Sequence, residues 1–201
     1  MTEATQHGLA GIVLAGGRSR RMGQDKASLD WEGRPMVKVI AEAVGERCKP
    51  VLIAAPASSQ AHDELGDDPE LTWITDEQVG KGPLAGIVAA LKAAKAADAS
   101  AAFVCATDMP LLAPELIDEL LGAMTSAPDV VIVHDGGRDH PLAGIYRVRA
   151  LPALQAQLDS GDVLMTNALE AVTTYRVGVS DPAWLTNVDA PEDLHRLRAG
   201  A

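Results

Sequence analysis

Short apolar runs alternate with helical patterns along this chain. Most of the runs are continuously apolar, as in Ala101–Ala106, and do not alternate between apolar and polar positions. Continuous apolar runs are typical of strands that are covered on both faces of a sheet. The predicted strands are Ala10–Leu14, Val51–Ala55, Leu71–Thr75, Ala101–Ala106, Val130–His134, Ala143–Arg147 and Tyr175–Val179.

Helical spacing separates these strands. In Pro83–Ala97, the apolar residues Leu84, Ile87, Val88 and Leu91 fall on one face. The predicted helices are Pro35–Cys48, Pro83–Ala97, Pro114–Met124, Ala150–Leu158, Val163–Ala171 and Pro191–Arg198. The alternation predicts a single α/β domain over residues 1–201, with a doubly wound, mostly parallel sheet and helices on both faces. Within it, we expect residues 1–8 to be disordered.

The composition excludes several classes of partner. The formal net charge of −11 argues against binding to nucleic acid or to an anionic membrane. No apolar run approaches the length of a membrane span, and Met1–Gly8 has neither a basic nor an apolar leader. Cys48 and Cys105 lie in apolar surroundings without metal-site spacing, so we expect a cytoplasmic protein with reduced cysteines.

The segment Leu14–Lys26 follows the first predicted strand and combines three glycines with four basic residues. Backbone amides of a glycine loop can surround phosphate oxygens, and Lys and Arg neutralise their charge. The order of the glycines fits neither the dinucleotide-binding fingerprint nor the Walker pattern. A plain turn with solvated arginines is the alternative, but the loop is long and basic for that role. The segment therefore predicts a triphosphate site.

Asp108 ends the buried run Ala101–Ala106 at the edge of the sheet where ligands of doubly wound folds bind. A carboxylate there can hold Mg²⁺ against phosphates. Alone, Asp108 could equally be a turn or helix-capping residue before Pro110. The neighbouring basic loop favours the metal.

Three further segments carry polar residues. Gly82–Gly86 opens a helix, where it could bind an anion or simply pack the helix on the sheet. His134–Leu142 has the chemistry of a hairpin turn, with Arg138 and His140 at its exit suited to an anionic ligand. Asp189, considered alone, would cap the last helix.

The ordered motifs L-A-G-G-x-S-R-R-M-G-x-D-K, G-P-L-A-G, T-D-M-P, H-D-G-x-R-x-H-P-L and N-V-[ND]-x-P-E-[DE]-L extend over nearly the whole chain. This set resembles the molybdenum cofactor guanylyltransferase family of the nucleotidyltransferase superfamily. The resemblance implies a Rossmann-like nucleotidyltransferase fold. It also implies Mg²⁺-dependent transfer of GMP from GTP to the terminal phosphate of Mo-molybdopterin, with release of pyrophosphate, and contact with molybdoenzymes or their chaperones.

Roles for single residues follow from the same resemblance. The nucleotide would be held by Leu14, Ala15, Gly16, Gly17, Lys26, Asp76 and Asp108. The catalytic residues would be Arg21, Lys26 and Asp108, the first two at the phosphates and the third at the metal. The acceptor would contact Gly82, Arg138, His140 and Asn187. Asp189 stands where the family carries a second Asn, and as an acid it could be a further metal ligand.

Three alternatives remain open at this point. Gly16, where cytidylyltransferase relatives tend to carry Ala in the pattern L-A-A-G, favours guanine, yet a cytidylyltransferase for the same acceptor shares most of the motifs. A sugar-phosphate nucleotidyltransferase shares the fold, although many carry an extra C-terminal domain. A non-catalytic molybdopterin carrier or adaptor would have no need of Lys26 and Asp108.

Overall fold

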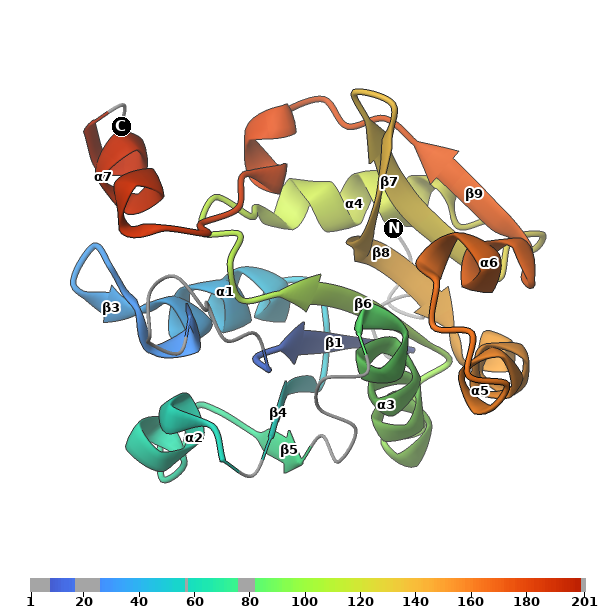
Figure 1. Cartoon of the computed structure of the whole chain (residues 1–201), viewed down its shortest axis with the longest axis horizontal. Coiled ribbons are helices and arrows are strands. Elements are labelled where there is room, and N and C mark those ends of the chain that lie inside the picture. Colours follow the sequence, from blue (N-terminus) through green and yellow to red (C-terminus); the bar gives the residue numbers. More distant parts are fainter. Residues whose placement is uncertain (1–7, 17–25, 57, 76–81, 200–201) are drawn as a thin grey trace.

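A seven-stranded sheet forms the centre of the computed structural model, which describes residues 8–16, 26–56, 58–75 and 82–199 (Figure 1). The strand order is β5-β4-β1-β6-β8-β7-β9. The strands are β1 (Leu9–Leu14), β4 (Val51–Ala55), β5 (Trp73–Thr75), β6 (Ala101–Ala106), β7 (Val130–Asp135), β8 (Arg138–Arg147) and β9 (Thr174–Val177). In this sheet β8 pairs antiparallel with both neighbours, and the other pairs are parallel. The predicted mostly parallel sheet is confirmed.

Helices cover both faces of the sheet. They are α1 (Met36–Gly45), α2 (Gln60–Leu65), α3 (Pro83–Ala96), α4 (Pro114–Ala123), α5 (Leu151–Asp159), α6 (Met165–Glu170) and α7 (Pro191–Ala199). Short 3₁₀ helices are η2 (Lys26–Ser28), η3 (Val148–Ala150) and η4 (Pro182–Leu185), and a small hairpin pairs β2 (Asp30–Trp31) with β3 (Arg34–Pro35). The helices α1 and α4 pack on one face, and α3, α5 and α6 on the other (Figure 1).

Neighbouring strand residues enter opposite core layers. On β6, Phe103 packs in the layer of α1 and α4, whereas Val104 packs in the layer of α3 and α5. Val131 and Ile132 of β7 divide in the same way, and all four side chains are fully buried. Because both faces are covered, apolar residues occupy consecutive positions along each strand. This explains the continuous apolar runs in the sequence.

Several predicted boundaries were wrong. The strand predicted over Leu71–Thr75 begins at Trp73, and the one predicted over Ala143–Arg147 begins at Arg138. The latter extends because Gly136 and Gly137 adopt positive φ angles of 57° and 79°, so the hairpin closes tightly and Asp135 pairs with Arg138. Arg138 and His140 are therefore strand residues. The predicted helices Pro35–Cys48 and Val163–Ala171 are shorter, at Met36–Gly45 and Met165–Glu170.

The sequence pattern missed α2 and the β2–β3 hairpin. Six residues are too few to show helical spacing, and α2 buries Ala61 alone among its side chains. A local signal was present, because the Ser59 hydroxyl accepts a hydrogen bond from the amide of His62, as in a typical N-cap.

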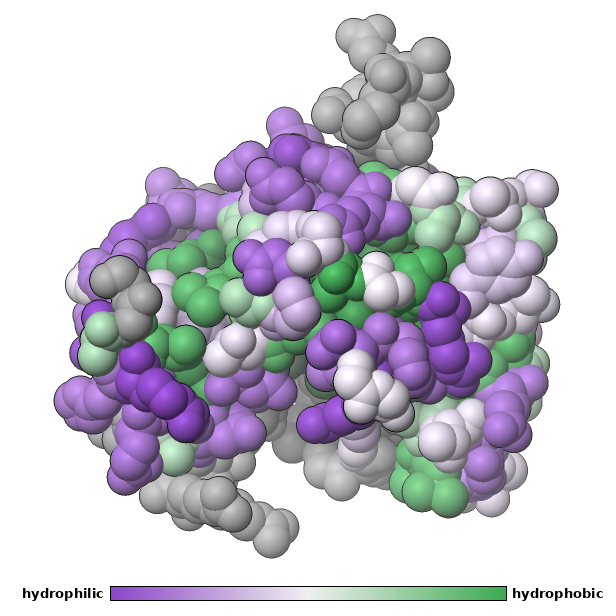
Figure 2. Space-filling model, turned by 90° about the horizontal axis from the view of Figure 1, so that it is seen from above, coloured by the Kyte–Doolittle hydropathy of each residue, from purple (hydrophilic) through white to green (hydrophobic). Residues whose placement is uncertain are grey.

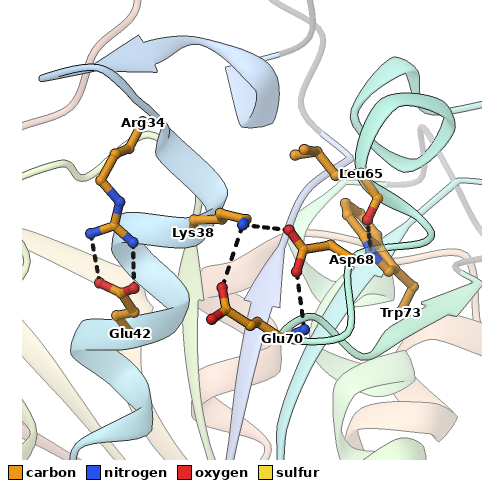
Figure 3. Close-up of polar contacts among 7 residues, drawn as sticks. All are labelled: Arg34, Lys38, Glu42, Leu65, Asp68, Glu70 and Trp73. Carbon is orange, nitrogen blue, oxygen red and sulfur yellow. Dashed lines mark hydrogen bonds and ion pairs between the residues drawn. The ribbon is translucent and has the colours of Figure 1, made fainter.

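Charged side chains connect α1 to the segment that leads into the edge strand β5 (Figure 3). Lys38 forms ion pairs with Asp68 and, at 3.4 Å, with Glu70. The Glu70 amide donates to the Asp68 carboxylate at 3.0 Å, and Trp73 Nε1 donates to the Leu65 carbonyl at 3.3 Å. These contacts fix the approach to β5 from the helix layer.

The surface is mainly hydrophilic. In Figure 2, hydrophilic residues border the visible face and apolar residues show between them. Among the described residues, Val163, Leu164 and Tyr175 are the large apolar side chains that are exposed. No helix in the described ranges has the length and apolar character needed to cross a membrane. Cys48 and Cys105 are buried free thiols, and burial raises the pKa of Cys48 to about 12.

Gly11 is required where α1 crosses β1. A Cβ atom at this position would lie 2.3 Å from Val44 Cγ1 and 3.0 Å from Cys48 Cβ. We therefore expect Gly11→Ala to lower the free energy of unfolding by about 1–3 kcal/mol, the usual cost of overpacking a core. Urea denaturation measures this.

Gly122→Ala is the matched control, because a Cβ in this α4 position meets nothing within 4 Å. Helix propensity then predicts a gain of up to about 1 kcal/mol. Equal unfolding free energies for the two variants would contradict the packing argument.

Candidate active site

The parallel strands bring the ends of β1 and β6 to one edge of the sheet. Backbone hydrogen bonds continue past the strands: the Ala15 amide donates to the Ala54 carbonyl at 2.7 Å, and the Thr107 amide to the Leu14 carbonyl at 3.3 Å. Ala15 is buried, while Leu14 and Gly16 are half-buried. This edge is where doubly wound sheets bind ligands. Gly17, Arg21 and Asp76, predicted for the same site, lie outside the described residues.

A buried lysine joins two acids at this edge. Lys26 Nζ donates to Asp108 Oδ2 at 2.8 Å and to Asp189 Oδ1 at 2.6 Å. Lys26 opens η2, Asp108 follows β6, and Asp189 precedes α7. The side chains of Lys26 and Asp108 are 11% and 18% exposed, whereas that of Asp189 is 64% exposed. One cation is thus shared by two carboxylates, one sheltered and one facing solvent.

The two acids keep the lysine charged. Burial by itself lowers the pKa of Lys26, but the hydrogen bonds to Asp108 and Asp189 outweigh burial, and the pKa lies above its ordinary 10.5. A group whose pKa is higher in the folded than in the unfolded protein stabilises the fold fully when the pH lies below the unfolded-state pKa. This stabilisation is lost only as the pH rises through the folded-state pKa. The cluster therefore persists through the neutral range.

The donor set of this cluster suits Mg²⁺. That ion prefers oxygen ligands and is usually held by one or two carboxylates together with substrate phosphates. Asp108 and Asp189 supply two carboxylates around one point of positive charge, at Lys26 Nζ. Within the described ranges, no group of three or more His, Cys, Asp or Glu side chains is placed so that it could hold a metal ion. A metal here would need oxygen atoms from its substrates as well.

Asp189 owes its position to its neighbours. The Val188 amide donates to the Asp108 carbonyl at 2.8 Å, and this fixes the segment beside the end of β6. The amides of Asp189 and Ala190 both donate to Asp193 Oδ2 at 2.9 Å. The side chain that accepts these amides at the start of α7 is thus Asp193, and the Asp189 carboxylate is directed to Lys26. Asp193 is the third residue of α7 and accepts the amides that precede the helix, as the acid of a capping box does.

A cavity of about 190 Å³ opens next to Asp108. Its walls include three of the four predicted acceptor residues, Arg138, His140 and Asn187, from β8 and the segment before α7. The fourth, Gly82, is not a wall residue, although its neighbour Pro83 is. Gly82 instead forms the exposed N-cap of α3 with φ +83° and ψ −178°, a conformation that favours glycine.

A bulge in β8 shapes this cavity. Ile132 pairs with Gly144, and the next residue of β7, Val133, pairs with His140. The three β8 residues between His140 and Gly144 therefore have no partners on β7. These residues, 141–143, line the cavity. The hydroxyl of the fully buried Tyr146 donates to the Pro141 carbonyl at 2.8 Å and holds the bulge. Sequence reasoning missed Tyr146, although a proline within a strand signals a bulge.

Burial is the main influence on the charge of His140. Burial and the adjacent Arg138 guanidinium lower its pKa below the ordinary 6.5, and Asp135 and Asp139 only partly oppose this shift. His140 is therefore a neutral imidazole at pH 7, able to donate or accept a hydrogen bond. The positive charge of this wall comes from Arg138.

Comparison with known proteins agrees with this geometry. Residues 11–174 match the family model described as MobA-like NTP transferase domain. The chain belongs to this family. A relative from Mycobacterium marinum, named "Probable molybdenum cofactor guanylyltransferase", is 40% identical over 188 residues, which are 92% of this chain and 91% of the relative.

Solved structures share the fold of this MobA-like NTP transferase domain. The molybdopterin-guanine dinucleotide biosynthesis protein A of Archaeoglobus fulgidus superposes with a TM-score of 0.79 at 24% identity, covering 96% of this chain and all of that one. A CMP:2-keto-3-deoxy-manno-octonic acid synthetase complexed with CTP gives 0.71 at 16% identity, covering 95% and 97%. The fold alone therefore does not select the base of the nucleotide.

We expect Tyr146→Phe to release the bulge of this MobA-like domain. The lost hydroxyl leaves the Pro141 carbonyl without its partner, so the free energy of unfolding should fall by about 1–3 kcal/mol. Amide hydrogen exchange at residues 142 and 143 should accelerate. Tyr175→Phe is the control, because Tyr175 is the second tyrosine of the chain and is exposed. Equal stability of both variants would show that the hydrogen bond does not hold the bulge.

The pKa of His140 predicts a pH effect on stability. The folded pKa lies below the unfolded one, so the unfolded chain binds more protons as the pH falls through 6.5. Acidification from pH 7.5 to 5.5 should therefore destabilise the wild type more than His140→Gln. Denaturation curves of both proteins at both pH values give the loss of unfolding free energy for each protein. The other titrating groups are common to the two proteins, so their contributions cancel when the two losses are subtracted. Parallel pH dependence of the two proteins would argue against a depressed His140 pKa.

Proposed function

We propose that this protein transfers GMP from GTP to the terminal phosphate of Mo-molybdopterin and releases pyrophosphate. The observation that carries the proposal is the cluster of Lys26, Asp108 and Asp189. Its member Asp108 lines a cavity together with Arg138, His140 and Asn187. Charged groups for a phosphate-transfer reaction thus adjoin a separate compartment for a second substrate. The name and the 40% identity of the mycobacterial relative support guanine as the base and molybdopterin as the acceptor.

In this reaction an oxygen of the acceptor phosphate attacks the α-phosphorus of GTP. A new phosphoanhydride bond forms, and the bond from the α-phosphorus to the bridging oxygen breaks, so that its electron pair leaves with pyrophosphate. The attacking phosphate is already anionic, and no side chain has to remove a proton. Catalysis then depends on positioning and on neutralising charge.

Lys26 supplies a fixed positive charge at the reaction centre. Its raised pKa keeps it protonated at neutral pH, and its burial strengthens its attraction for a phosphate. Asp108 and Asp189 are the residues that would hold Mg²⁺, which when bound would neutralise charge on the phosphates. Lys26 bonds both acids, so we expect its ammonium to pass from carboxylates to phosphate oxygens when the substrates bind.

The acceptor side is held by different elements. The Arg138 side chain is exposed and has no hydrogen bond or ion pair to any described residue, so it is available to an anionic substrate. Neutral His140 can hydrogen-bond to the acceptor without adding charge, and Asn187 offers an amide next to Asp108. These residues orient the acceptor phosphate toward Lys26.

The test is GMP transfer measured as pyrophosphate release with Mo-molybdopterin and saturating MgGTP. We expect Lys26→Ala and Asp108→Asn each to lower kcat by about 10²–10³-fold, the usual effect of removing one group that stabilises developing charge. Lys38→Ala is the control, since Lys38 pairs with Asp68 and Glu70 in the helix layer, and it should stay within about twofold of the wild-type kcat.

The same assay with CTP, ATP and UTP tests the base. Turnover with GTP alone supports guanylyl transfer, and a preference for CTP would assign the protein to cytidylyl transfer. Wild-type kcat in both Lys26→Ala and Asp108→Asn would refute the proposed site. Binding of acceptor or nucleotide without any turnover would favour the carrier alternative.

A further inference from the structure

A second cavity, of about 410 Å³, adjoins the β7–β8 hairpin. Its walls come from the hairpin, from α6 and from the edge strand β9. Arg138, Asp139 and Pro141 line this cavity as well as the one beside Asp108. The two cavities are therefore neighbours, separated by the residues of the hairpin that they share.

The second cavity is positively charged in an otherwise acidic protein. Arg138 and Arg176 line it, with Asp139 as the acid among its wall residues, whereas the whole chain has a formal net charge of −11. Arg176 Nε donates to both carboxylate oxygens of Asp139 at 3.0 Å, and His134 Nδ1 lies 2.7 Å from Asp139 Oδ1. With Asp139 engaged in this way, Arg138 is the cation that remains for a ligand.

An apolar wall faces these charges. Met165 and Leu169 of α6 line the cavity, with Leu169 buried and Met165 half-buried. Thr166, between them along the helix, is exposed at the same cavity. A wall of this kind suits a flat ring system whose edge carries polar groups.

The first cavity is small for a complete acceptor. Its volume of about 190 Å³ falls below the roughly 300–1,000 Å³ that small-molecule sites usually offer, and the two volumes together fall within that range. An acceptor whose phosphate lies at Lys26 must therefore extend out of the first cavity, and the hairpin residues Arg138 and Pro141 border the adjacent space.

We propose that this second cavity is the distal half of the acceptor site, and that it holds the ring system of the acceptor while the phosphate reaches past Arg138 to Lys26. This rests on the proposed function for the identity of the acceptor. Arg176 acts as a positioning residue, because it fixes Asp139 and thereby leaves Arg138 to bridge the two cavities. Thr166 is an exposed wall residue at which a larger side chain can be introduced.

The test fills the cavity. Thr166→Trp should raise the KM for Mo-molybdopterin by at least tenfold, while the KM for GTP and kcat at saturating acceptor stay within twofold. Ala171→Trp is the matched control, because Ala171 is exposed just after α6 and does not line the cavity. Arg176→Gln should also raise the acceptor KM, and Arg176→Lys should recover part of the loss by restoring the ion pair with Asp139. Unchanged acceptor KM in Thr166→Trp and Arg176→Gln would overturn the proposal.

A binding measurement separates this proposal from the reaction itself. Isothermal titration calorimetry with metal-free molybdopterin, in the absence of nucleotide, measures acceptor binding directly. We expect the Kd of Thr166→Trp to be at least tenfold higher than the Kd of the wild type and of Ala171→Trp. If the wild type transferred no GMP, this difference would still support the second cavity and would refute only the proposed reaction. Transfer by the wild type with equal binding to all three proteins would support the reaction and refute the second cavity.

Discussion

The sharing of one ammonium by two carboxylates is the interaction on which the candidate site depends. Lys26 lies 82 residues from Asp108 and 163 from Asp189 along the chain, so this contact connects the first loop, the middle strand and the C-terminal segment. A buried lysine without partners would favour its neutral form. Here the acids keep it charged, and it in turn holds two negative side chains next to each other. The charges at the site thus balance one another through this one contact.

The reversed strand β8 provides the second element of the site. In a purely parallel sheet, every strand would contribute only the residues at its carboxyl end to the ligand-binding edge. Because β8 runs the other way, its first residues, Arg138 and His140, lie at that edge. The bulge at 141–143 then lines the cavity, and the hydroxyl of the buried Tyr146 holds the bulge through its hydrogen bond to the Pro141 carbonyl.

Much of this architecture could be predicted from the sequence, because its causes are local. Continuous apolar runs and helical spacing gave the order of strands and helices, and the position of Asp108 after such a run placed it at the ligand edge. The contacts of Lys26 with both acids could not be predicted, since they depend on how three distant segments pack. The length of β8 depended on the φ angles of Gly136 and Gly137, and Tyr146 was indistinguishable from any apolar strand residue. Helix α2 was too short for a periodic pattern.

The reversed direction of β8 also divides the central sheet into two regions that tolerate changes in chain length to different degrees. The edge formed by β1, β4 and β6 belongs to a core in which each strand is fixed by neighbours on both sides. The β7–β8 hairpin, in contrast, ends in the exposed glycines 136 and 137, where insertions or deletions disturb no core packing. A change in the length of this hairpin would therefore reshape the cavity wall at Arg138, while the packing around β1, β4 and β6 would stay the same.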